Sequence, residues 1–375
     1  MANTRTKRVT AAMVARRAGV SISAVSLVVN GKDAGRISAA NAERIRSAVD
    51  ELGYVVDRIA ATLVRGRSDL VILVAPDLAN PFFGQVIRGI RAELGDRYRL
   101  LLSVTDSGVQ PSAADVRQFA ALRPAGLLVD APSAAFLDEL GAEEPIVLLD
   151  APGLEDRATA VNYDIAPGVS ALVDHLHALG HRTIGYLDAS TGTETFARRR
   201  TLLLRAARRL GMTVLTDRDN DAAVTVTDAD ADADADAGAA VAGAPVDSTT
   251  PAAADLDLAA AAEVAAHVLP TWRAAGATAV VCAADTLAYG LLAAAAGLGI
   301  RVPDELAVAG FDDLPSSVVT APPLTSVSLP GGALGRSAAR RLLAAIDGDG
   351  PDSDGAHHDT ELLTATLVIR ASTAG

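Results

Sequence analysis

The chain has 375 residues, half of them hydrophobic, so it can form more than one domain and bury a large core. Its net charge of −13 is uneven: residues 1–67 hold twelve Lys or Arg and five Asp or Glu, a charge of +7, and the remainder carries −20. No apolar run approaches the ~20 residues of a membrane span and no apolar segment follows the basic N-terminus, which excludes an integral membrane protein and a secretory signal and indicates the cytoplasm. The single cysteine, Cys282, excludes an intramolecular disulfide framework.

The stretch Val9–Asn30 predicts two short helices joined by a tight turn. Thr10 and Ser21 are placed to cap the two helices through their hydroxyls, and Gly19 can take the positive φ of the turn. The outer side of the second helix is predicted to carry Ile22, Ser23, Ser26 and Leu27. These features favour a helix-turn-helix, whose second helix enters the DNA major groove, over an ordinary helical hairpin.

A third helix is predicted at Ala39–Leu52, capped by Ser38 and ended by Gly53. The next helical pattern, residues 57–66, begins at an Asp and ends at a Gly. It is shorter than the ~12–15 residues that an isolated helix needs, so it should fold only when a partner orders it. A plain linker is the alternative.

From Leu70 onward, buried apolar strands alternate with amphipathic helices, which predicts an α/β body with two parallel sheets covered on both faces. The predicted strands are Leu70–Ala75, Leu100–Val104, Gly126–Val129, Ile146–Leu149, Thr183–Leu187, Ala279–Cys282 and Leu306–Gly310. The predicted helices are Phe83–Leu94, Ser112–Leu122, Ala134–Leu140, Gly168–Leu179, Phe196–Leu210 and Thr286–Leu298. Ligands of such folds bind at the carboxyl ends of the strands, and a cleft between two lobes is the expected site.

Residues 217–258 interrupt this alternation with the run Asp228–Asp236, in which Asp and Ala alternate. Such a run repels itself and has nothing to bury, so we expect a disordered insertion. A calcium site is disfavoured because the glycine turns and spaced ligands of known calcium loops are missing.

No catalytic constellation is present: the chain has no P-loop, no G-x-G-x-x-G, no G-x-S-x-G and no zinc-type spacing of Cys and His. His175 and His177 are two apart on a predicted helix and face different sides, and His357 and His358 fall in a Gly/Asp-rich loop. We therefore expect neither an enzyme nor a metal or other cofactor.

Several motifs occur in a fixed order along the chain. They are AGVS and VVNG within Ala18–Gly31, RIS and ELGY within Arg36–Tyr54, NPFF at Asn80–Phe83, HLHALGHRTIGYL at His175–Leu187, VPDELAVAGFDDLP at Val302–Pro315, PPLTSVSLPGGALGRSAARRLL at Pro322–Leu343 and LVIRAST at Leu367–Thr373. Together they resemble the LacI/GalR family of bacterial transcription regulators over nearly the whole chain outside the insertion.

The resemblance implies a helix-turn-helix domain at residues 1–56, a hinge helix at 57–67 and an effector-binding and dimerisation body at 68–375. The body is similar to a periplasmic sugar-binding protein, with three strand crossings between two lobes. Lobe one is placed at about 68–166 and 326–348, and lobe two at about 167–325 and 349–375.

By the same resemblance, the protein is a homodimer on a palindromic operator in double-stranded DNA. The implied DNA contacts are Thr10, Ser21, Ile22, Ser23, Ser26, Leu27, Asn30, Arg58 and Leu63, the last of which wedges into the minor groove. Two departures stand out: Val56-Asp57 replaces the usual Pro-Asn before the hinge, and Leu27 sits where many members carry arginine. Arginine reads guanine through two hydrogen bonds whereas leucine makes only apolar contacts, so the operator should differ from the common family pattern.

The implied effector contacts are Phe82, Phe83, Asp164, Arg199 and Asp312. The rings suit an apolar sugar face, the arginine fork suits bidentate contacts, and Asp312 can accept two hydroxyls. Solvated or interlobe ion pairs are the alternative for the charged residues, and core packing is the alternative for the phenylalanines. Ala284 replaces an expected asparagine, which removes one polar contact. A sugar or polyol is the preferred effector, and a nucleobase or nucleoside is the second choice.

The sequence therefore predicts a DNA-binding transcriptional repressor whose operator affinity is controlled by a small molecule held between two lobes. The alternative is a cytoplasmic sugar- or nucleoside-binding protein without specific DNA readout. The chain ends with no leucine heptads after the family's last strand, which favours a dimer over a tetramer. Both inducer and corepressor logic remain open.

Overall fold

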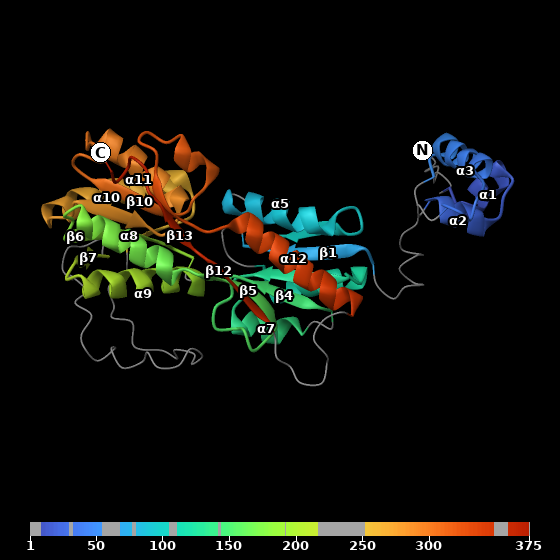
Figure 1. Ribbon diagram of the computed structural model, residues 1–375, viewed down its shortest axis with the longest axis horizontal. Coiled ribbons are helices and arrows are strands. Elements are labelled where there is room, and N and C mark those ends of the chain that lie inside the picture. Colours follow the sequence, from blue (N-terminus) through green and yellow to red (C-terminus); the bar gives the residue numbers. More distant parts are fainter. Residues whose placement is uncertain are drawn as a thin grey trace, which may run out of the picture. The chain divides into compact units, whose positions relative to one another are not determined.

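The computed structural model describes residues 9–29, 33–54, 68–76, 80–104, 111–141, 144–191, 193–216, 252–348 and 359–374. The chain divides into two compact units, Met1–Ser68 and Asp69–Gly375, here called the head and the body (Figure 1). Each unit has its own apolar core and is described by itself.

The head contains the three predicted helices, α1 (Ala11–Ala18), α2 (Ile22–Val29) and α3 (Ala39–Leu52). The chain bends by 103° between α1 and α2, the geometry of a helix-turn-helix. The bend is possible because α1 ends at Gly19, whose φ of +65° is the left-handed conformation that glycine adopts without strain. Apolar residues of all three helices, among them Val14, Val25 and Ile45, form the head's core.

The predicted caps of the head have different outcomes. The Ser21 Oγ accepts a hydrogen bond from the backbone N–H of Ala24 at 3.1 Å, and Ser38 caps α3 in the same way through Asn41. Thr10 occupies the N-cap position of α1 with extended backbone, but its hydroxyl makes no capping hydrogen bond, so that part of the prediction is wrong.

Among the described helices, no single one has the length and apolarity to cross a membrane; α1 and α2 taken together reach those values across their bend.

Lobe one of the body is built on a parallel sheet with the strand order β12-β5-β4-β3-β1-β2. These strands are β1 (Leu70–Val74), β2 (Arg99–Ser103), β3 (Gly126–Asp130), β4 (Ile146–Leu149), β5 (Thr159–Asp164) and β12 (Thr360–Thr364). Successive residues of β1 face opposite sides, so Val71 and Leu73 belong to one cluster of apolar side chains and Ile72 and Val74 to another. Both faces of this sheet are therefore buried.

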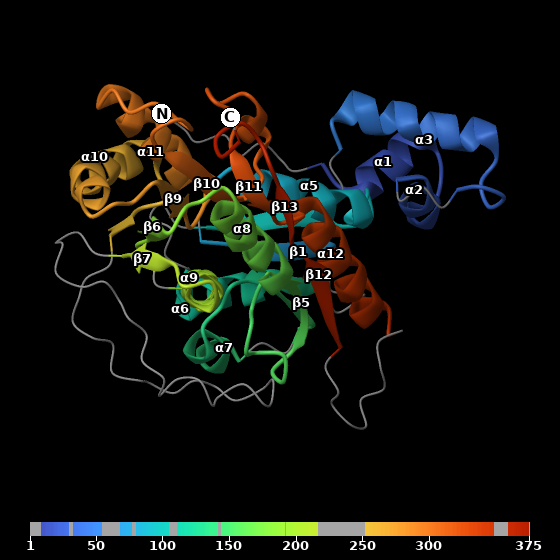
Figure 2. The same ribbon diagram turned by 60° about the vertical axis from the view of Figure 1, so that its left-hand side comes forward.

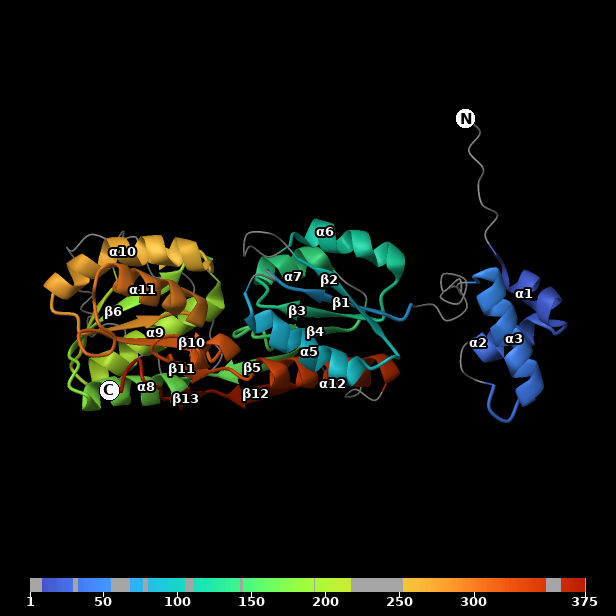
Figure 3. The same ribbon diagram turned by 90° about the horizontal axis from the view of Figure 1, so that it is seen from above.

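Helices α5 (Phe82–Leu94) and α12 (Gly331–Asp347) lie side by side over one face of lobe one, and α6 (Ala113–Arg117), the 3-10 helix η1 (Gln118–Leu122) and α7 (Ala134–Leu140) contribute to the other (Figure 3). The α5–α12 contact requires glycine. A Cβ on Gly335 would lie 2.1 Å from the carbonyl oxygen of Val86, so any side chain there would force the two helices apart.

Lobe two has the strand order β13-β11-β10-β9-β6-β7, and β8 pairs with β6. The strands are β6 (Thr183–Ala189), β7 (Thr213–Leu215), β8 (Ala253–Ala254), β9 (Ala279–Cys282), β10 (Ala307–Asp312), β11 (Thr325–Ser328) and β13 (Thr366–Val368). All described pairs are parallel except β11 with β13, which is antiparallel. Helices α8 (Ala166–Ala178) and α9 (Glu194–Arg209) cover one face, and α10 (Leu258–Ala274) and α11 (Asp285–Gly297) cover the other (Figure 2). The predicted fold class is confirmed.

The chain crosses between the lobes three times: after β5, after β11 and at Ala365 between β12 and β13 (Figure 1). The lobe limits differ from those predicted. Residues 360–364 were assigned to lobe two, but as β12 they pair with β5 at the edge of the lobe-one sheet. Residues 326–328 were assigned to lobe one, but as part of β11 they pair with β10 in lobe two. The prediction missed that one short C-terminal segment supplies an edge strand to each sheet in turn.

The predicted insertion is too long at its C-terminal end. Ala253–Ala254 form β8, and the carboxylate of Asp257 caps α10 by accepting hydrogen bonds from the N–H groups of Ala259 and Ala260 at 2.9 and 3.0 Å. An aspartate followed by an Ala-rich apolar run is a helix start. The remainder of the predicted insertion, residues 217–251, lies outside the described residues.

Candidate functional site

The predicted DNA-reading residues of α2 lie on the side of the helix that faces away from the head's core. Val25 and Val28 are buried in that core, whereas Ile22 is 55% exposed and Ser23 and Ser26 are also exposed. Leu27 is half-buried at the edge of this face. The exposed face combines hydroxyls with apolar groups, which suits hydrogen bonds to base edges and contact with thymine methyl groups.

Ser21 and Thr10 are exposed next to this face, at the starts of α2 and α1. Asn30, Arg58 and Leu63 lie outside the described residues, and their DNA contacts stay predictions, as do those of the α2 residues. In the described part of the head, Arg17 is paired with Glu51 at 2.6 Å and Arg46 with Asp33 at 2.7 Å, both at the surface.

A second group of functional candidates gathers between the lobes of the body, at the carboxyl ends of the strands. We call it the interlobe cluster, and it consists of Asp130 at the end of β3, Asp150 after β4, Tyr163 in β5, Arg199 in α9 and Asp312 at the end of β10. The charge of Arg199 acts on all four of the other groups, although they come from both lobes. A direct interlobe hydrogen bond, from the Thr195 hydroxyl to the Asp150 carbonyl oxygen at 3.3 Å, lies beside it.

Arg199 is held in place on several sides. Its Nη1 donates to the carbonyl oxygen of Ala283 at 2.7 Å and to Asp312 Oδ1 at 3.1 Å. The guanidinium carbon lies 4.9 Å from the ring centre of Phe196 and 5.3 Å from that of Phe311, within the range of cation–π attraction. The side chain is only 5% exposed, yet its Nε is buried without a hydrogen-bond partner among the described residues. An unsatisfied buried donor is costly, so this N–H is available for a ligand.

Asp312 combines burial, charge and an uncommon backbone conformation. Burial raises the pKa of its carboxyl to about 6, while the neighbouring Arg199 cation opposes the rise. Its φ is +100°, and that of the next residue, Asp313, is +51°. Positive φ in residues other than glycine is retained where surrounding contacts determine the conformation, as at binding sites.

The carboxylates of lobe one also carry raised pKa values. Burial raises the pKa of Asp130 well above its ordinary range, and the charge of Asp150 adds to the effect. Burial likewise raises the pKa of Asp150, with Arg199 opposing it. Three buried acidic groups with raised pKa values therefore surround one arginine, and such perturbed groups gather at functional sites more often than at surface ion pairs.

Several buried hydroxyls near these strand ends have no hydrogen-bond partner among the described residues. They are those of Tyr163, Thr191, Thr193 and Thr286. The hydroxyl of Tyr186 in β6 has none either. Buried polar atoms are nearly always satisfied in folded proteins, so such hydroxyls are candidates for hydrogen bonds to water or to a polar ligand. Each hydroxyl can both donate and accept, which matches the hydroxyls of a sugar.

Both residues of the predicted aromatic pair are buried in the core of the body, and Phe82 also adjoins the interlobe cluster. Phe82 lies edge-on to Tyr163, with ring centres 6.4 Å apart, and so adjoins the interlobe cluster. Phe83 is buried in the core of the body and contacts Phe82 at 5.7 Å. Asp164 follows Tyr163 in β5, so its side chain points to the opposite face of the strand. The effector roles of Phe82, Phe83, Asp164, Arg199 and Asp312 remain predictions.

Sequence reasoning missed Asp130, Asp150 and Tyr163. A signal for the two aspartates was available, because each lies at the carboxyl end of a buried strand, where ligands of parallel sheets bind.

A separate surface hollow of about 290 Å³ lies between α6 and α7, on the face of the lobe-one sheet opposite α5 and α12. Its lining includes Val116, Leu140 and Glu144. It contains none of the predicted site residues. No group of three or more acidic, His or Cys side chains suited to a metal occurs among the described residues.

Comparison with known proteins gives consistent results for both units. Residues 10–57 match the family of bacterial regulatory proteins called the lacI family, and residues 173–373 match a periplasmic binding protein-like domain. The chain is 30% identical to the HTH-type transcriptional regulator CelR of Thermobifida fusca, over 92% of this chain and 94% of CelR. It is also 30% identical to the regulator reg1 of Streptomyces lividans, over 96% and 95% of the two chains.

Solved structures show the same architecture. The Lac repressor dimer bound to operator and the anti-inducer ONPF is similar with a TM-score of 0.73 and 24% identity, over 98% of this chain and all of that one. The complex of the transcriptional regulator CelR with cellobiose is similar with a TM-score of 0.62 and 25% identity, over 97% of this chain and all of that one.

Proposed function

Because the chain belongs to the LacI family of bacterial transcriptional regulators, we propose that it binds a palindromic operator as a homodimer and that a sugar bound at the interlobe cluster controls its operator affinity. It is an effector-controlled DNA-binding regulator, and its relatives are regulators rather than enzymes. The observation that carries the sugar proposal is the buried Arg199–Asp312 pair, beside which Arg199 Nε and the Tyr163 hydroxyl have no hydrogen-bond partner among the described residues.

The chemistry of the interlobe cluster matches a polyhydroxylated ligand better than an apolar one. Carboxylates such as Asp312 accept hydrogen bonds from sugar hydroxyls, and the free Nε of Arg199 donates to a sugar oxygen. Phe82 and Tyr163 supply aromatic rings beside these groups, which suits the apolar face of a sugar ring. CelR, the relative solved with cellobiose, makes cellobiose the first sugar to test, and a nucleoside is the second choice of effector class.

In the proposed mechanism, the dimer has two states. In one state the two heads are spaced for the half-sites of the operator, α2 of each head lies in the major groove, and the hinge at residues 57–67 folds on DNA with Leu63 in the minor groove. In the other state the lobes are rearranged and the heads are no longer so spaced. The effector shifts this equilibrium only through its different affinities for the two states, typically by 1–3 kcal/mol.

The experiment has two stages. A thermal-shift screen of cellobiose, ribose, other sugars and nucleosides identifies a ligand, because binding to the folded state alone raises Tm. An operator is then selected from random duplexes, and its affinity is measured with and without that ligand at several salt concentrations. We expect a sugar to raise Tm and to change operator affinity at least fivefold.

Two variants sharpen this experiment. Arg199→Ala should abolish the sugar response, whereas Arg209→Ala should not, because Arg209 lies on the same helix but pairs with Asp174 at the surface. A protein that binds sugars but no duplex in preference to another is instead a sugar-binding protein without specific readout. A Tm response to nucleosides alone would overturn the sugar assignment.

A further inference from the structure

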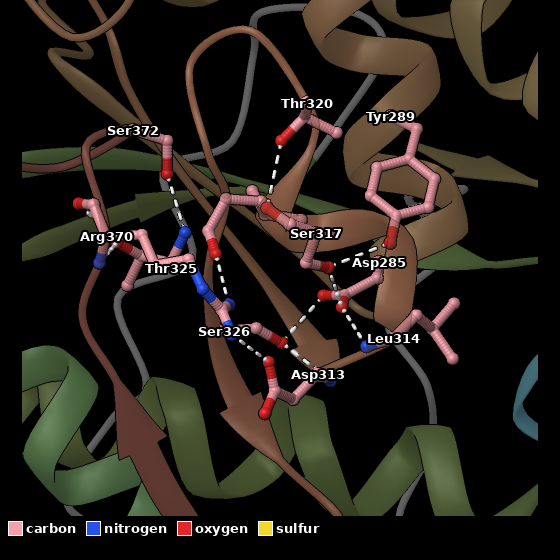
Figure 4. A network of polar contacts seen from close by, with 11 residues as sticks. Asp285, Tyr289, Asp313, Leu314, Ser317, Thr320, Thr325, Ser326, Arg370 and Ser372 are labelled. Carbon is pink, nitrogen blue, oxygen red and sulfur yellow. Dashed lines mark hydrogen bonds and ion pairs between the residues drawn. The ribbon is translucent and has the colours of Figure 1, made fainter. Parts of the chain in front are cut away.

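A buried carboxylate outside the interlobe cluster binds the loop that carries Asp312. Asp285, the first residue of α11, has no solvent exposure. Its Oδ2 accepts hydrogen bonds from the backbone N–H of Leu314 at 2.8 Å and from the Ser317 hydroxyl at 2.6 Å, and its Oδ1 accepts one from the Ser326 hydroxyl at 2.7 Å (Figure 4). One carboxylate thus joins α11, the segment after β10, and β11.

The approach of Asp285 to this loop depends on Gly310 in β10. A Cβ at position 310 would lie 2.3 Å from Asp285 Oδ1 and 3.2 Å from the Asp285 Cα. The backbone of α11 cannot yield easily because it is packed between its sheet and α10. The absence of a side chain at Gly310 therefore leaves room for the Asp285 carboxylate to pack against β10, the strand that ends at Asp312.

The loop itself needs such an anchor because its backbone is strained. Asp312 and Asp313 both have positive φ, a conformation that is unfavourable for residues other than glycine. Three contacts hold them: the Asp313 N–H donates to the Ser326 hydroxyl at 3.0 Å, the Asp313 carboxylate pairs with Arg370 at 2.6 Å, and the next N–H, of Leu314, donates to Asp285.

The hydrogen-bond directions in this network are set by Asp285. Ser317 donates to Asp285, so it accepts from the Tyr289 hydroxyl 2.8 Å away. Ser326 donates to the other carboxylate oxygen and accepts from the Asp313 N–H. Figure 4 shows the hydrogen bonds from Ser317 and from Ser326 reaching the Asp285 carboxylate from two sides. Burial raises the pKa of Asp285 to about 7, and the hydrogen bonds from Ser317, Ser326 and Leu314 oppose that rise. When the carboxyl is ionised, these bonds are charge-assisted and stronger than neutral ones, and linked bonds strengthen one another.

We propose that Asp285 is a positioning residue of the effector site: its carboxylate holds residues 312–317 in the conformation that aims Asp312 at Arg199 and at the bound ligand. Asp285 itself touches no ligand in this proposal. The proposal rests on the proposed function in one respect, namely that Asp312 contacts the effector. It predicts that effector affinity depends on a side chain that is separated from the ligand by the loop it holds.

The test compares Asp285→Asn with Ser372→Ala in the full-length protein. Asparagine keeps the shape of the side chain but replaces one acceptor oxygen by a donor. Ser372 is equally buried and also joins separate segments, accepting from the Thr325 N–H at 2.8 Å and donating to the Val308 carbonyl at 2.6 Å, and neither of these hydrogen bonds involves residues 312–317. It therefore controls for a general loss of buried hydrogen bonds in lobe two.

The first measurement needs no ligand. Hydrogen exchange of the Asp313 and Leu314 amides, followed by NMR, should be at least tenfold faster in Asp285→Asn than in the wild type and unchanged in Ser372→Ala. Cellobiose affinity by calorimetry should fall about tenfold in Asp285→Asn, and combining it with Ser326→Ala should add little further loss, because both variants release the same loop.

Wild-type exchange rates at Asp313 and Leu314 in Asp285→Asn would overturn the positioning role, and so would equal loosening of this loop in Ser372→Ala. If the wild type binds no cellobiose and no other sugar, the proposed effector class fails, while the exchange measurement still decides whether Asp285 holds the loop.

Discussion

The DNA-reading face of the head and the interlobe cluster of the body are built in opposite ways. The reading face is contiguous: Ile22, Ser23 and Ser26 come from one eight-residue helix and project outward from a core made by the other side of that helix. The interlobe cluster is assembled from five separate segments, and its main charged pair, Arg199 with Asp312, is buried. In the first site the residues proposed to bind DNA do not hold the fold, whereas in the second the residues proposed to bind the effector do.

Because of this difference, binding and stability can change separately at the exposed face of α2 but are expected to change together where charged residues are buried in the interlobe cluster. A side chain on the exposed face can change with little effect on unfolding, since exposed substitutions usually cost within about 0.5 kcal/mol. A change in the buried cluster should alter effector binding and stability together, because removing one member leaves another charge or dipole buried without its partner.

Arg199→Ala should cause the largest change. It leaves the Asp312 carboxylate buried without its cation and removes two hydrogen bonds, so we expect a loss of about 3–5 kcal/mol in the free energy of unfolding and more than a hundredfold loss of sugar affinity. Urea unfolding and calorimetry measure the two effects, with Arg209→Ala as the surface control on the same helix. Full stability together with lost binding would contradict the proposed coupling.

The free energy of unfolding should depend on pH differently in the wild type and in Asp312→Asn, because Asp312 can take up a proton and asparagine cannot. The folded-state pKa of Asp312 is raised to about 6, above the ordinary Asp value, so between about pH 4 and 6 the folded protein retains a proton that the unfolded chain has released. Asp312 therefore contributes to the free energy of unfolding below about pH 4, and this contribution is lost as the pH rises from about 4 to 6.

The difference in unfolding free energy between wild type and Asp312→Asn should consequently change by roughly 2–3 kcal/mol from pH 4 to pH 7, with the wild type relatively more stable at the acidic end. Unfolding by urea at a series of pH values measures this difference. A constant difference across the window would mean that Asp312 titrates normally and is less buried than the structure has it.

Leu27→Arg tests the exposed, contiguous site. The half-buried Leu27 can place a longer side chain toward solvent, so stability should change by less than about 0.5 kcal/mol. Arginine can form two hydrogen bonds to guanine, worth about 1–3 kcal/mol of discrimination, so selection from random duplexes should shift toward G·C at one symmetric pair of operator positions. An unchanged selection profile would show that Leu27 does not face the bases.

The sequence predicted most of the fold because its elements are signalled locally. The turn at Gly19, the cap at Ser38 and strands such as Ala279–Cys282 were placed from residues next to them. Helix α10 was missed because it is Ala-rich with weak periodicity and contains Pro270, and α12 was missed because it begins with Gly331 and Gly332, which have low helix propensity. Strand β12 was misplaced because the sheet that an edge strand joins is decided by tertiary pairing.

The candidate site was only half accessible from the sequence. Arg199 and Asp312 were found through the resemblance to a family, and their contact across 113 positions of chain became visible only in the structure. Asp285 was passed over because its role depends on three partners that lie 29 to 41 residues away, at Leu314, Ser317 and Ser326. A network of this kind has no sequence spacing of its own, so local patterns cannot reveal it.

Within the interlobe cluster, Tyr163→Phe should change sugar affinity least and tests the division most directly, since Tyr163 is buried yet its hydroxyl has no hydrogen-bond partner among the described residues. Removing an unsatisfied buried hydroxyl takes away a desolvation penalty and no hydrogen bond, so stability should be unchanged or rise by up to about 1 kcal/mol. Sugar affinity should fall about fivefold to tenfold if the ligand supplies the missing partner. Calorimetry with the sugar and urea unfolding without it measure the two quantities. A stability loss with unchanged affinity would assign the hydroxyl to the fold, and would place Tyr163 with the core residues rather than with the ligand.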